Sequence, residues 1–211
     1  MNSKPNSRSR VIITLLLTVV FLIGVTSCQK KGTWTVEEQQ LIETYSNQIM
    51  PLCVVDETND SLFLRKECQS LSHEDVKDSL FVKLKQQMLL TVNNPENEGV
   101  GIAAPQVGIS RRLVAVQRFD KEGTPFELYI NPTFIYLSDE KREGWEGCLS
   151  VPGKQGKVER SSWLVISYND EKTFEIHNDT VKGFTAVIFQ HEVDHLNGIL
   201  YTDRSSELRV K

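Results

Sequence analysis

The order of periodic segments in this sequence predicts an α+β fold. Two segments with helical spacing of apolar residues lie between positions 36 and 92, and another occupies 185–196. The stretch between them has short apolar or partly alternating runs, which are typical of strands. Helices and strands are therefore largely segregated along the chain. Its 211 residues are enough for one well-buried domain, or at most two small ones.

The helical spacing predicts three helices, at 36–50, 72–92 and 185–196. Pro51 ends the first helix, and Ser72 followed by Asp75 is a possible N-terminal cap of the second. Gly198 lies just past the end of the third helix, where glycine commonly stops a helix. Residues 51–64, between the first two helices, look irregular or extended.

Four short segments predict strands, at 113–116, 126–130, 163–168 and 174–177. The last five residues, 207–211, are mostly charged, and we expect them to form a frayed tail. A folded domain at 36–206 followed by this tail is the organisation that the pattern predicts.

The N-terminal residues resemble a bacterial export signal. Three basic residues and no acid occur in the first ten positions, and Val11–Val25 is predominantly apolar. Such a run is too short for a membrane-spanning helix of about 20 residues, but it fits a secretory signal. Val25-Thr26-Ser27-Cys28 then resembles a lipobox. We predict a signal peptide at 1–27, a lipidated Cys28 and a tether at 28–35; an uncleaved anchor or an artefactual upstream start are the alternatives.

Cleavage after residue 27 would make the protein more acidic. The net charge would change from −4 to −7, because the removed segment holds three basic residues and no acid. Such a balance argues against a nucleic-acid-binding protein. We expect a membrane-anchored bacterial lipoprotein that faces the periplasm, with a cytoplasmic location as the alternative, and we expect a monomer.

The cysteines separate into two groups if Cys28 carries lipid. Cys53 and Cys68 could form a disulfide in an oxidising compartment, which would close a loop of about 15 residues and contribute about 3 kcal/mol. Two independent buried thiols are the alternative. Either way Cys148 is left over, and a lone thiol in an exported protein needs another explanation.

Residues 191–195 read HEVDH, which matches the HExxH pattern of metal-binding helices. His191 and His195, four residues apart, project from one helix face and can bind one ion. Glu192 lies beside them and can accept a proton from water. A chance match is one alternative. A buried structural histidine pair is another, but it would not require Glu192.

The third metal ligand must come from upstream of this motif. In the longer HExxHxxGxxH pattern the last histidine is a ligand, but here Tyr201 stands at that position. Glu207 lies in the predicted tail. Cys148, between Gly147 and a Ser-Val-Pro-Gly turn, is the better candidate, because one Cys and two His leave an open coordination position on zinc or ferrous iron. A buried small apolar residue is the alternative for Cys148.

Residues 99–108 are rich in glycine and alanine, which allows another backbone to approach closely. Gln106 in this segment could direct an amide N–H at a developing oxyanion. Glycine-rich turns of this kind are common, so the segment carries little weight alone.

Together, GVGIAAPQ, EGCLS and QHEVDH resemble the three signature motifs of the peptide deformylases. The similarity runs from about Asn97 to Arg204, is thinner over 37–96 and does not cover 1–35. It implies antiparallel sheets packed around a central HExxH helix in a catalytic domain at 36–206. It also implies a hydrolase that removes the N-formyl group from N-formylmethionyl peptides and releases formate.

The resemblance assigns roles to individual residues. It implies the metal ligands Cys148, His191 and His195. The ion would be Fe²⁺ natively, with Zn²⁺ or Ni²⁺ as substitutes. Glu192 would pass a proton from water to the leaving amine, while Gln106 and the backbone N–H of Leu149 would meet the oxyanion with the metal. Glu146 and Arg160 resemble recurring family positions with a supporting role.

The resemblance further implies the substrate contacts Val100, Gly101, Gly147, Val187 and Ile188. Val100 and Gly147 would pair with the peptide backbone, and Val187 and Ile188 would contribute to a methionine pocket beside Gly101. Deformylation normally takes place on nascent chains in the cytosol, which conflicts with an export signal. An HExxH metallopeptidase with a downstream ligand, or a non-catalytic lipoprotein that binds formyl-peptides, therefore remain alternatives.

Overall fold

The computed structural model of the protein describes residues 33–211. The predicted signal peptide at 1–27, Cys28 and the tether up to residue 32 lie outside the described residues. The helices are α1 (Val36–Thr44), α2 (Thr58–Leu64), α3 (His73–Lys77), α4 (Ser79–Val92), the 3-10 turn η1 (Ala104–Val107), α5 (Gly183–Leu196) and α6 (Tyr201–Arg204). The strands are β1 (Gly101–Ala103), β2 (Leu113–Gln117), β3 (Phe126–Leu137), β4 (Lys141–Cys148), β5 (Val151–Ser161), β6 (Trp163–Asn169), β7 (Ile176–Lys182) and β8 (Glu207–Val210).

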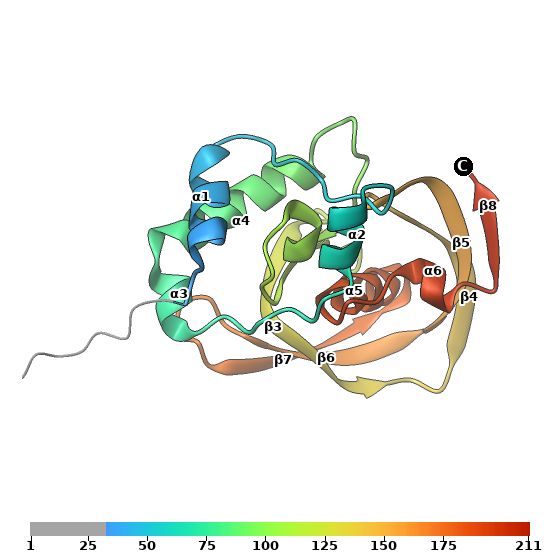
Figure 1. Cartoon of the computed structure of the whole chain (residues 1–211). Coiled ribbons are helices and arrows are strands. Elements are labelled where there is room, and N and C mark those ends of the chain that lie inside the picture. The colour runs from blue at the N-terminus through green and yellow to red at the C-terminus, as the bar shows by residue number, and fades with distance from the viewer. Residues whose placement is uncertain (1–32) are drawn as a thin grey trace, which may run out of the picture. The chain divides into compact units, whose positions relative to one another are not determined.

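The strands form two antiparallel sheets. A five-stranded sheet has the order β1-β2-β3-β6-β7, and a three-stranded sheet has the order β4-β5-β8. Helices α1, α3 and α4 lie at one end of the domain, whereas β4, β5 and β8 lie at the other (Figure 1). This arrangement confirms the predicted α+β class with antiparallel sheets.

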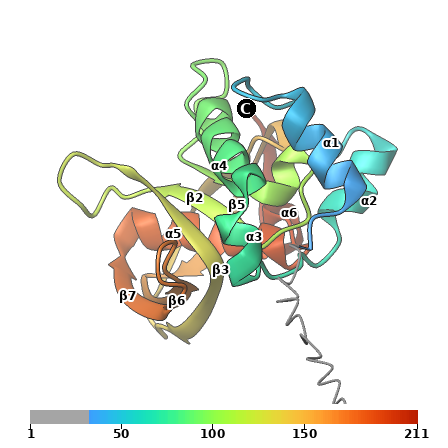
Figure 2. The ribbon, with the colours of Figure 1, turned by 90° about the vertical axis from the view of Figure 1, so that its left-hand side faces the viewer.

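Helix α5 lies between the sheets and contacts strands of both. Figure 2 shows β3, β6 and β7 wrapped around one side of it. The helix is apolar overall, and 11 of its 14 residues are buried. All 11 lie between Thr185 and Leu196. Ala186, Phe189 and Val193 pack into one apolar core with residues of the larger sheet. Because most of α5 is buried, the packed neighbours hold its polar side chains in place. A functional site requires side chains that are held in this way.

The N-terminal helices differ from the predicted ones in their boundaries. α1 ends at Thr44, and the second predicted helix is two helices, α3 and α4, separated by Asp78. Asp78 has an extended backbone with ψ 145°, and its side chain caps α4 by accepting from Leu80 N. The prediction that 51–64 is irregular is wrong for 58–64, which form α2.

Strand β3 extends beyond its predicted end because it is interrupted rather than terminated. Its pairing with β6 shifts register between Ile130 and Thr133, around Asn131 and Pro132. Asn131 has a positive φ of 51°, and its side chain exchanges hydrogen bonds with the backbone of Leu71. A proline without an N–H and a residue with positive φ form a local irregularity in the ladder, after which pairing resumes.

Residues predicted as loosely held are part of the fold at both ends of the domain. Residues 207–210 form β8, which pairs with β5, so the predicted frayed tail is wrong for this segment. At the other end Thr33 donates from its N and Oγ1 to Asp75. Arg111 in turn donates to Oγ1 and the carbonyl oxygen of Thr33. The last tether residues therefore belong to the folded domain.

Cys53, Cys68 and Cys148 are free thiols, so the described residues contain no Cys53–Cys68 disulfide. Burial raises the pKa of both Cys53 and Cys68 to about 11. Within residues 33–211, no helix is both long and apolar enough to span a bilayer.

We expect Asp75→Asn to lower the free energy of unfolding by about 1 kcal/mol near pH 7, because Asp75 accepts from the N-cap residue Ser72 in the capping box of α3 and holds Thr33. Burial raises the pKa of Asp75, but hydrogen bonds from Ser72 and Thr33 outweigh it and hold that pKa below its ordinary value. This stabilisation is therefore present above the unfolded pKa of about 3.9 and is lost as the pH falls through the folded pKa.

Urea unfolding of the wild type and Asp75→Asn between pH 7 and pH 3 measures this effect. The stability difference should shrink toward the acid end, while Glu74→Gln, on the exposed neighbour, should change little. A difference that stays constant over this pH range would show that the Asp75 charge contributes nothing.

Candidate metal centre and cleft

Three side chains from two elements converge beside the C-terminal half of α5. His191 and His195 lie on one face of the helix, and Cys148 is the last residue of β4. Candidate ligand atoms of the three residues all lie within 4.8 Å of one another. Cys148 Sγ is 3.2 Å from His195 Nε2. The structure thus brings together the three residues that the sequence predicted as ligands.

A change of strand register places Cys148 toward the helix. Gly147 pairs with Gln155 across the β4–β5 hairpin, but the next residue, Cys148, pairs with Val151. Ser150 N donates to Cys148 Sγ at 3.4 Å, and Gln106 Nε2 does so at 3.5 Å. The turn lies at Leu149 and Ser150, whereas the last three residues of the predicted Ser-Val-Pro-Gly turn begin β5. The turn supplies a backbone donor to the sulfur.

The surroundings of the sulfur favour its ionised form. Burial raises the pKa of Cys148, but the adjacent imidazoles of His195 and His191 outweigh it and hold the pKa well below its ordinary value. For His191 burial lowers the pKa, while contacts with Cys148 and Glu146 raise it well above the usual range. A thiolate beside two imidazoles is a donor set that suits a divalent transition metal.

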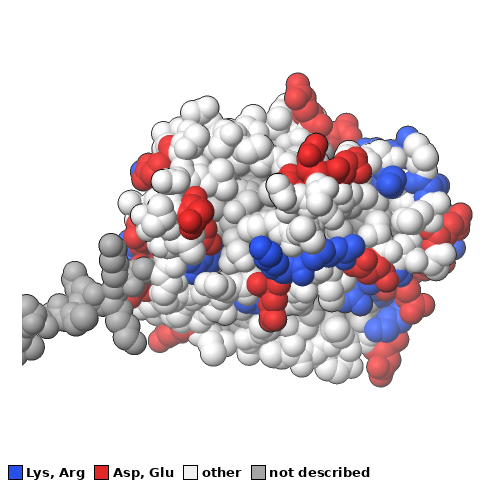
Figure 3. All heavy atoms as spheres, in the orientation of Figure 1, with Lys and Arg blue, Asp and Glu red and all other residues white. Residues whose placement is uncertain are grey.

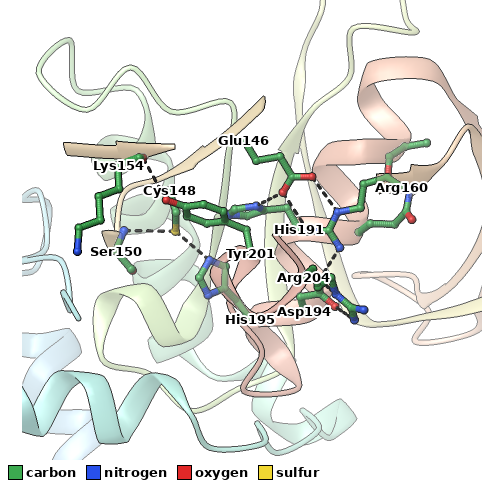
Figure 4. A network of polar contacts seen from close by, with 12 residues as sticks. Glu146, Cys148, Ser150, Lys154, Arg160, His191, Asp194, His195, Tyr201 and Arg204 are labelled. Carbon is green, nitrogen blue, oxygen red and sulfur yellow. Dashed lines mark hydrogen bonds and ion pairs between the residues drawn. The ribbon is translucent and has the colours of Figure 1, made fainter. Parts of the chain in front are cut away.

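A chain of buried charges fixes the orientation of His191. Its Nδ1 donates to Glu146 Oε2 at 2.9 Å, and Arg160 donates to both oxygens of the same carboxylate. Arg160 also donates to Asp194 at 2.5 Å, and Arg204 donates twice to Asp194 at 2.6 Å (Figure 4). A carboxylate on the outer nitrogen of a ligating histidine holds its ring and its tautomer.

Glu192 follows His191 on α5 and is buried where it lines the cleft. Burial raises its pKa to about 7, although the two imidazoles act in the lower direction. Its Oε2 has no hydrogen-bond partner among the described residues. Gly101 faces this carboxylate, and a Cβ at Gly101 would contact Glu192 Oε1 and lie 2.8 Å from Ile188 Cγ2. The close packing against β1 therefore requires glycine.

The residues present fit a metal ion. The Oε2 of Glu192 is a buried polar atom at the site that has no hydrogen-bond partner among the described residues, and an uncompensated group of this kind is costly without a ligand. The thiolate and the two imidazoles offer three donors that converge, and the triad leaves room for a fourth ligand. This is the donor set of an open, catalytic type of site.

An open cleft of about 580 Å³ reaches the ligand cluster. Its lining includes all of the substrate contacts predicted from the sequence, together with Gln106 and Leu149: Val100, Gly101, Gly147, Val187 and Ile188. Gln106 Oε1 accepts from Ala103 N at 2.8 Å, which directs Nε2 toward Cys148 and Ser150. The side-chain amide of Gln106, predicted as a donor, therefore lies in the cleft next to the sulfur of Cys148.

Several residues at this site escaped the sequence reasoning. The residues Trp145, Lys154, Phe184 and Lys211 line the cleft. Asp194 extends the buried charge chain, and the exposed Arg204 ends it at the surface. Phe184 had a usable signal, since it lies one helical turn before Val187 and Ile188. Lys154 and Lys211 had none, because strand pairing brings them to the cleft, β4 with β5 for Lys154 and β5 with β8 for Lys211.

The chain is similar to known proteins over most of this domain. A family model described as polypeptide deformylase matches residues 51–211. Curated relatives include a peptide deformylase from Leptospira biflexa, 40% identical over 154 residues, which cover 70% of this chain and 84% of the relative. Another from Desulforudis audaxviator is 47% identical over 111 residues, covering 52% and 69% of the two chains.

Solved structures give the same result. A class I type b peptide deformylase from Acinetobacter baumannii with bound Met-Ala-Ser is 34% identical with a TM-score of 0.66, covering 75% of this chain and 99% of that one. Its actinonin-bound form has a TM-score of 0.65 at 35% identity, over 75% and 99% of the two chains. A peptide deformylase from Thermotoga maritima is 32% identical with a TM-score of 0.66, over 76% and 99%.

We expect Glu146→Gln to weaken metal retention by about 10- to 100-fold, because it removes the charge that orients His191. Dialysis against a chelator followed by metal analysis measures the loss. Glu143→Gln is the matched control, since Glu143 lies on the same strand but is exposed and pairs only with Lys157. Equal retention in the two variants would show that the carboxylate does not act on the ligand.

Proposed function

The chain belongs to the peptide deformylase family, and from this premise we propose how its residues act, which ion they hold and where the protein resides. It is a metal-dependent hydrolase that removes the N-formyl group from N-formylmethionyl peptides and releases formate. The single observation that carries the residue assignment is the convergence of Cys148, His191 and His195 beside the buried carboxylate of Glu192.

We propose Cys148, His191 and His195 as the ligands of one divalent ion. When bound, the ion supplies Lewis acidity, which polarises the formyl carbonyl and makes water a stronger acid. The thiolate donor favours a transition metal over magnesium or calcium. Fe²⁺ is the proposed native ion, with Zn²⁺ or Ni²⁺ as substitutes. The family resemblance supports iron, and the donor set is compatible with all three.

Glu192 is the proposed proton carrier. A carboxylate whose pKa is about 7 accepts a proton from the attacking water and returns it to the leaving amine at neutral pH. Its burial excludes bulk water from the transfer. Gly101 leaves the space in which the carboxylate can approach the substrate's scissile amide.

Gln106 and the backbone N–H of Leu149 are the proposed donors to the oxyanion. Three hydrogen bonds support the position of Gln106, because one fixes its carbonyl oxygen and the other two direct its amide toward Cys148 and Ser150. Leu149 lies in the turn after Cys148 and lines the same cleft.

The formylated peptide is proposed to bind along the cleft with its backbone against Val100 and Gly147. The methionine side chain would pack against Val187 and Ile188, next to Gly101 and the exposed ring of Phe184. The related enzyme that carries Met-Ala-Ser supports a peptide in this cleft.

The proposed location is a bacterial membrane, to which the lipid anchors the protein with its catalytic domain facing the periplasm. The basic first residues, the apolar run and Val25–Cys28 support cleavage of residues 1–27 and lipidation of Cys28. A tether from Cys28 would then lead to the catalytic domain. On the face shown in Figure 3 acidic and basic side chains are interspersed, and the net charge is negative, which fits the expected lack of nucleic-acid binding.

Glu192→Ala should leave the ion bound while lowering kcat for formyl-Met-Ala-Ser by about 10²- to 10⁴-fold. Formate release and metal content of a protein comprising residues 29–211 are the measurements. If Glu192→Ala were fully active, the assignment of the proton carrier would be wrong. A wild type with no activity on any metal would favour the non-catalytic binding protein instead.

Cys148→Ser and Glu207→Ala separate the deformylase from a metallopeptidase with a downstream ligand. We expect Cys148→Ser to lose the ion, since a thiolate contributes strongly to transition-metal affinity. Glu207→Ala should retain it, because Glu207 is exposed on β8. Metal analysis that gives the reverse result would support the peptidase.

Cys28→Ala should block processing and leave a precursor that still carries residues 1–27. The precursor should be about three kilodaltons heavier than the mature polypeptide, because the 211-residue chain has a mass of 24.0 kDa and 27 residues account for that share of it. Membrane fractionation and intact-mass measurement check this. The wild type should remain with membranes, because several acyl chains exceed the two signals needed for stable anchoring. A soluble wild type with Met1 intact would contradict the lipoprotein assignment.

A further inference from the structure

Tyr201 occupies the position at which the longer HExxHxxGxxH motif carries a third histidine ligand. In the structure it is the first residue of α6, and its side chain is buried. Its ring stacks on the imidazole of His191, with ring centroids 5.9 Å apart and planes 21° from parallel. Its hydroxyl donates to the carbonyl of Lys154 at 3.1 Å (Figure 4). The residue at the ligand position therefore contacts a ligand without serving as one.

The ring also forms part of the wall behind the sulfur. Tyr201 packs with Val151, Val158 and Leu200, and Cys148 packs against this apolar cluster. A Cβ at Gly156 would lie 2.7 Å from the Tyr201 ring, so β5 has no room for a side chain there. The ring consequently fills the space between β5 and the ligands without slack.

His191 is therefore restrained in two independent ways. Glu146 fixes the nitrogen that faces away from the ion, as described above, but one hydrogen bond leaves the ring free to rock about it. The Tyr201 ring packs on the face of the imidazole and limits that rotation. Ligand geometry in metal sites depends on such supporting contacts as well as on the ligands.

The hydroxyl connects the same residue to the substrate cleft. Lys154 lies in the β5 segment that lines the cleft, and its carbonyl accepts from Tyr201. The hydrogen bond thus fixes the cleft wall relative to α6 and, through the stacked ring, to α5.

We propose that Tyr201 is a positioning residue in which ring and hydroxyl have separate tasks. The ring keeps the imidazole of His191 from rotating and packs behind Cys148. The ligands from β4 and α5 therefore remain close enough to bind one ion. The hydroxyl holds the Lys154 segment, which sets the geometry of peptide binding. This inference rests on the proposed ligand set of Cys148, His191 and His195.

The test uses cobalt-substituted protein comprising residues 29–211, with Tyr201→Leu, Tyr201→Phe and the control Phe81→Leu. Phe81 is fully buried in the separate core that α4 contributes to, so Phe81→Leu also removes a buried ring. The measurements are the visible absorption spectrum of the cobalt site, the rate of cobalt loss to a chelator, and kcat and KM for formyl-Met-Ala-Ser.

We expect Tyr201→Leu to lose cobalt about 10- to 100-fold faster and to change the cobalt spectrum. Tyr201→Phe should keep the spectrum and the release rate, because the ring remains, while KM rises about three- to tenfold at nearly constant kcat, as loss of one hydrogen bond implies. Phe81→Leu should lower thermal stability and leave the cobalt site unchanged.

A folded Tyr201→Leu protein with the wild-type spectrum and release rate would overturn the role of the ring. If that variant does not fold, Tyr201→Phe decides: an unchanged KM, or cobalt loss faster than in the wild type, overturns the separation of tasks. Cys148→Ser distinguishes the two levels of inference. If Cys148→Ser retains cobalt with the wild-type spectrum, the proposed ligand set itself is wrong.

Discussion

The site depends on one constraint, the burial of alternating charges between α5 and the smaller sheet. Glu146, Arg160 and Asp194 are each less than a tenth exposed, and each is paired with opposite charge. A buried ion pair adds little net stability, but removal of one partner leaves an uncompensated charge and is strongly destabilising. The pairs therefore fix relative positions more than they strengthen the fold. These pairs set the orientation of His191 through Glu146, and His191 in turn lines the cleft.

The sequence was sufficient for the parts of the site that local spacing determines. His191, Glu192 and His195 share a helix, so an interval of four residues already placed both imidazoles on one face. Glycine at 101 was also a local signal of close approach, although the groups that approach it are the side chains of Glu192 and Ile188 rather than another backbone. A turn near Cys148 was a local signal too, but it lies at Leu149 and Ser150, one residue earlier than predicted. Identification of Cys148 as a ligand needed elimination of downstream candidates and the family resemblance, since nothing local connects residue 148 to residue 191.

Three of the errors have a common physical cause, namely contacts between segments distant in sequence. Residues 207–210 look like a charged tail, yet the backbone of β5 supplies their hydrogen bonds and makes them a strand. Likewise β4 has little apolar alternation, because most of its residues are exposed, and only its pairing with β5 defines it. Thr33 reads as tether, but its partners Asp75 and Arg111 lie 42 and 78 residues away. Contacts of this kind do not produce a periodic pattern of apolar residues, so the sequence pattern cannot predict them.

The different environments of the three described cysteines give the protein chemical selectivity. The pKa of Cys53 and of Cys68 is about 11, whereas that of Cys148 lies well below its ordinary value. Alkylating reagents attack thiolates, so Cys148, which lines the cleft, is the sulfur open to modification at neutral pH. An ion bound to that sulfur would shield it. Mild iodoacetamide treatment followed by peptide mapping would therefore count the molecules that lack an ion, in a mixture where activity alone cannot separate an empty site from a poorly active one.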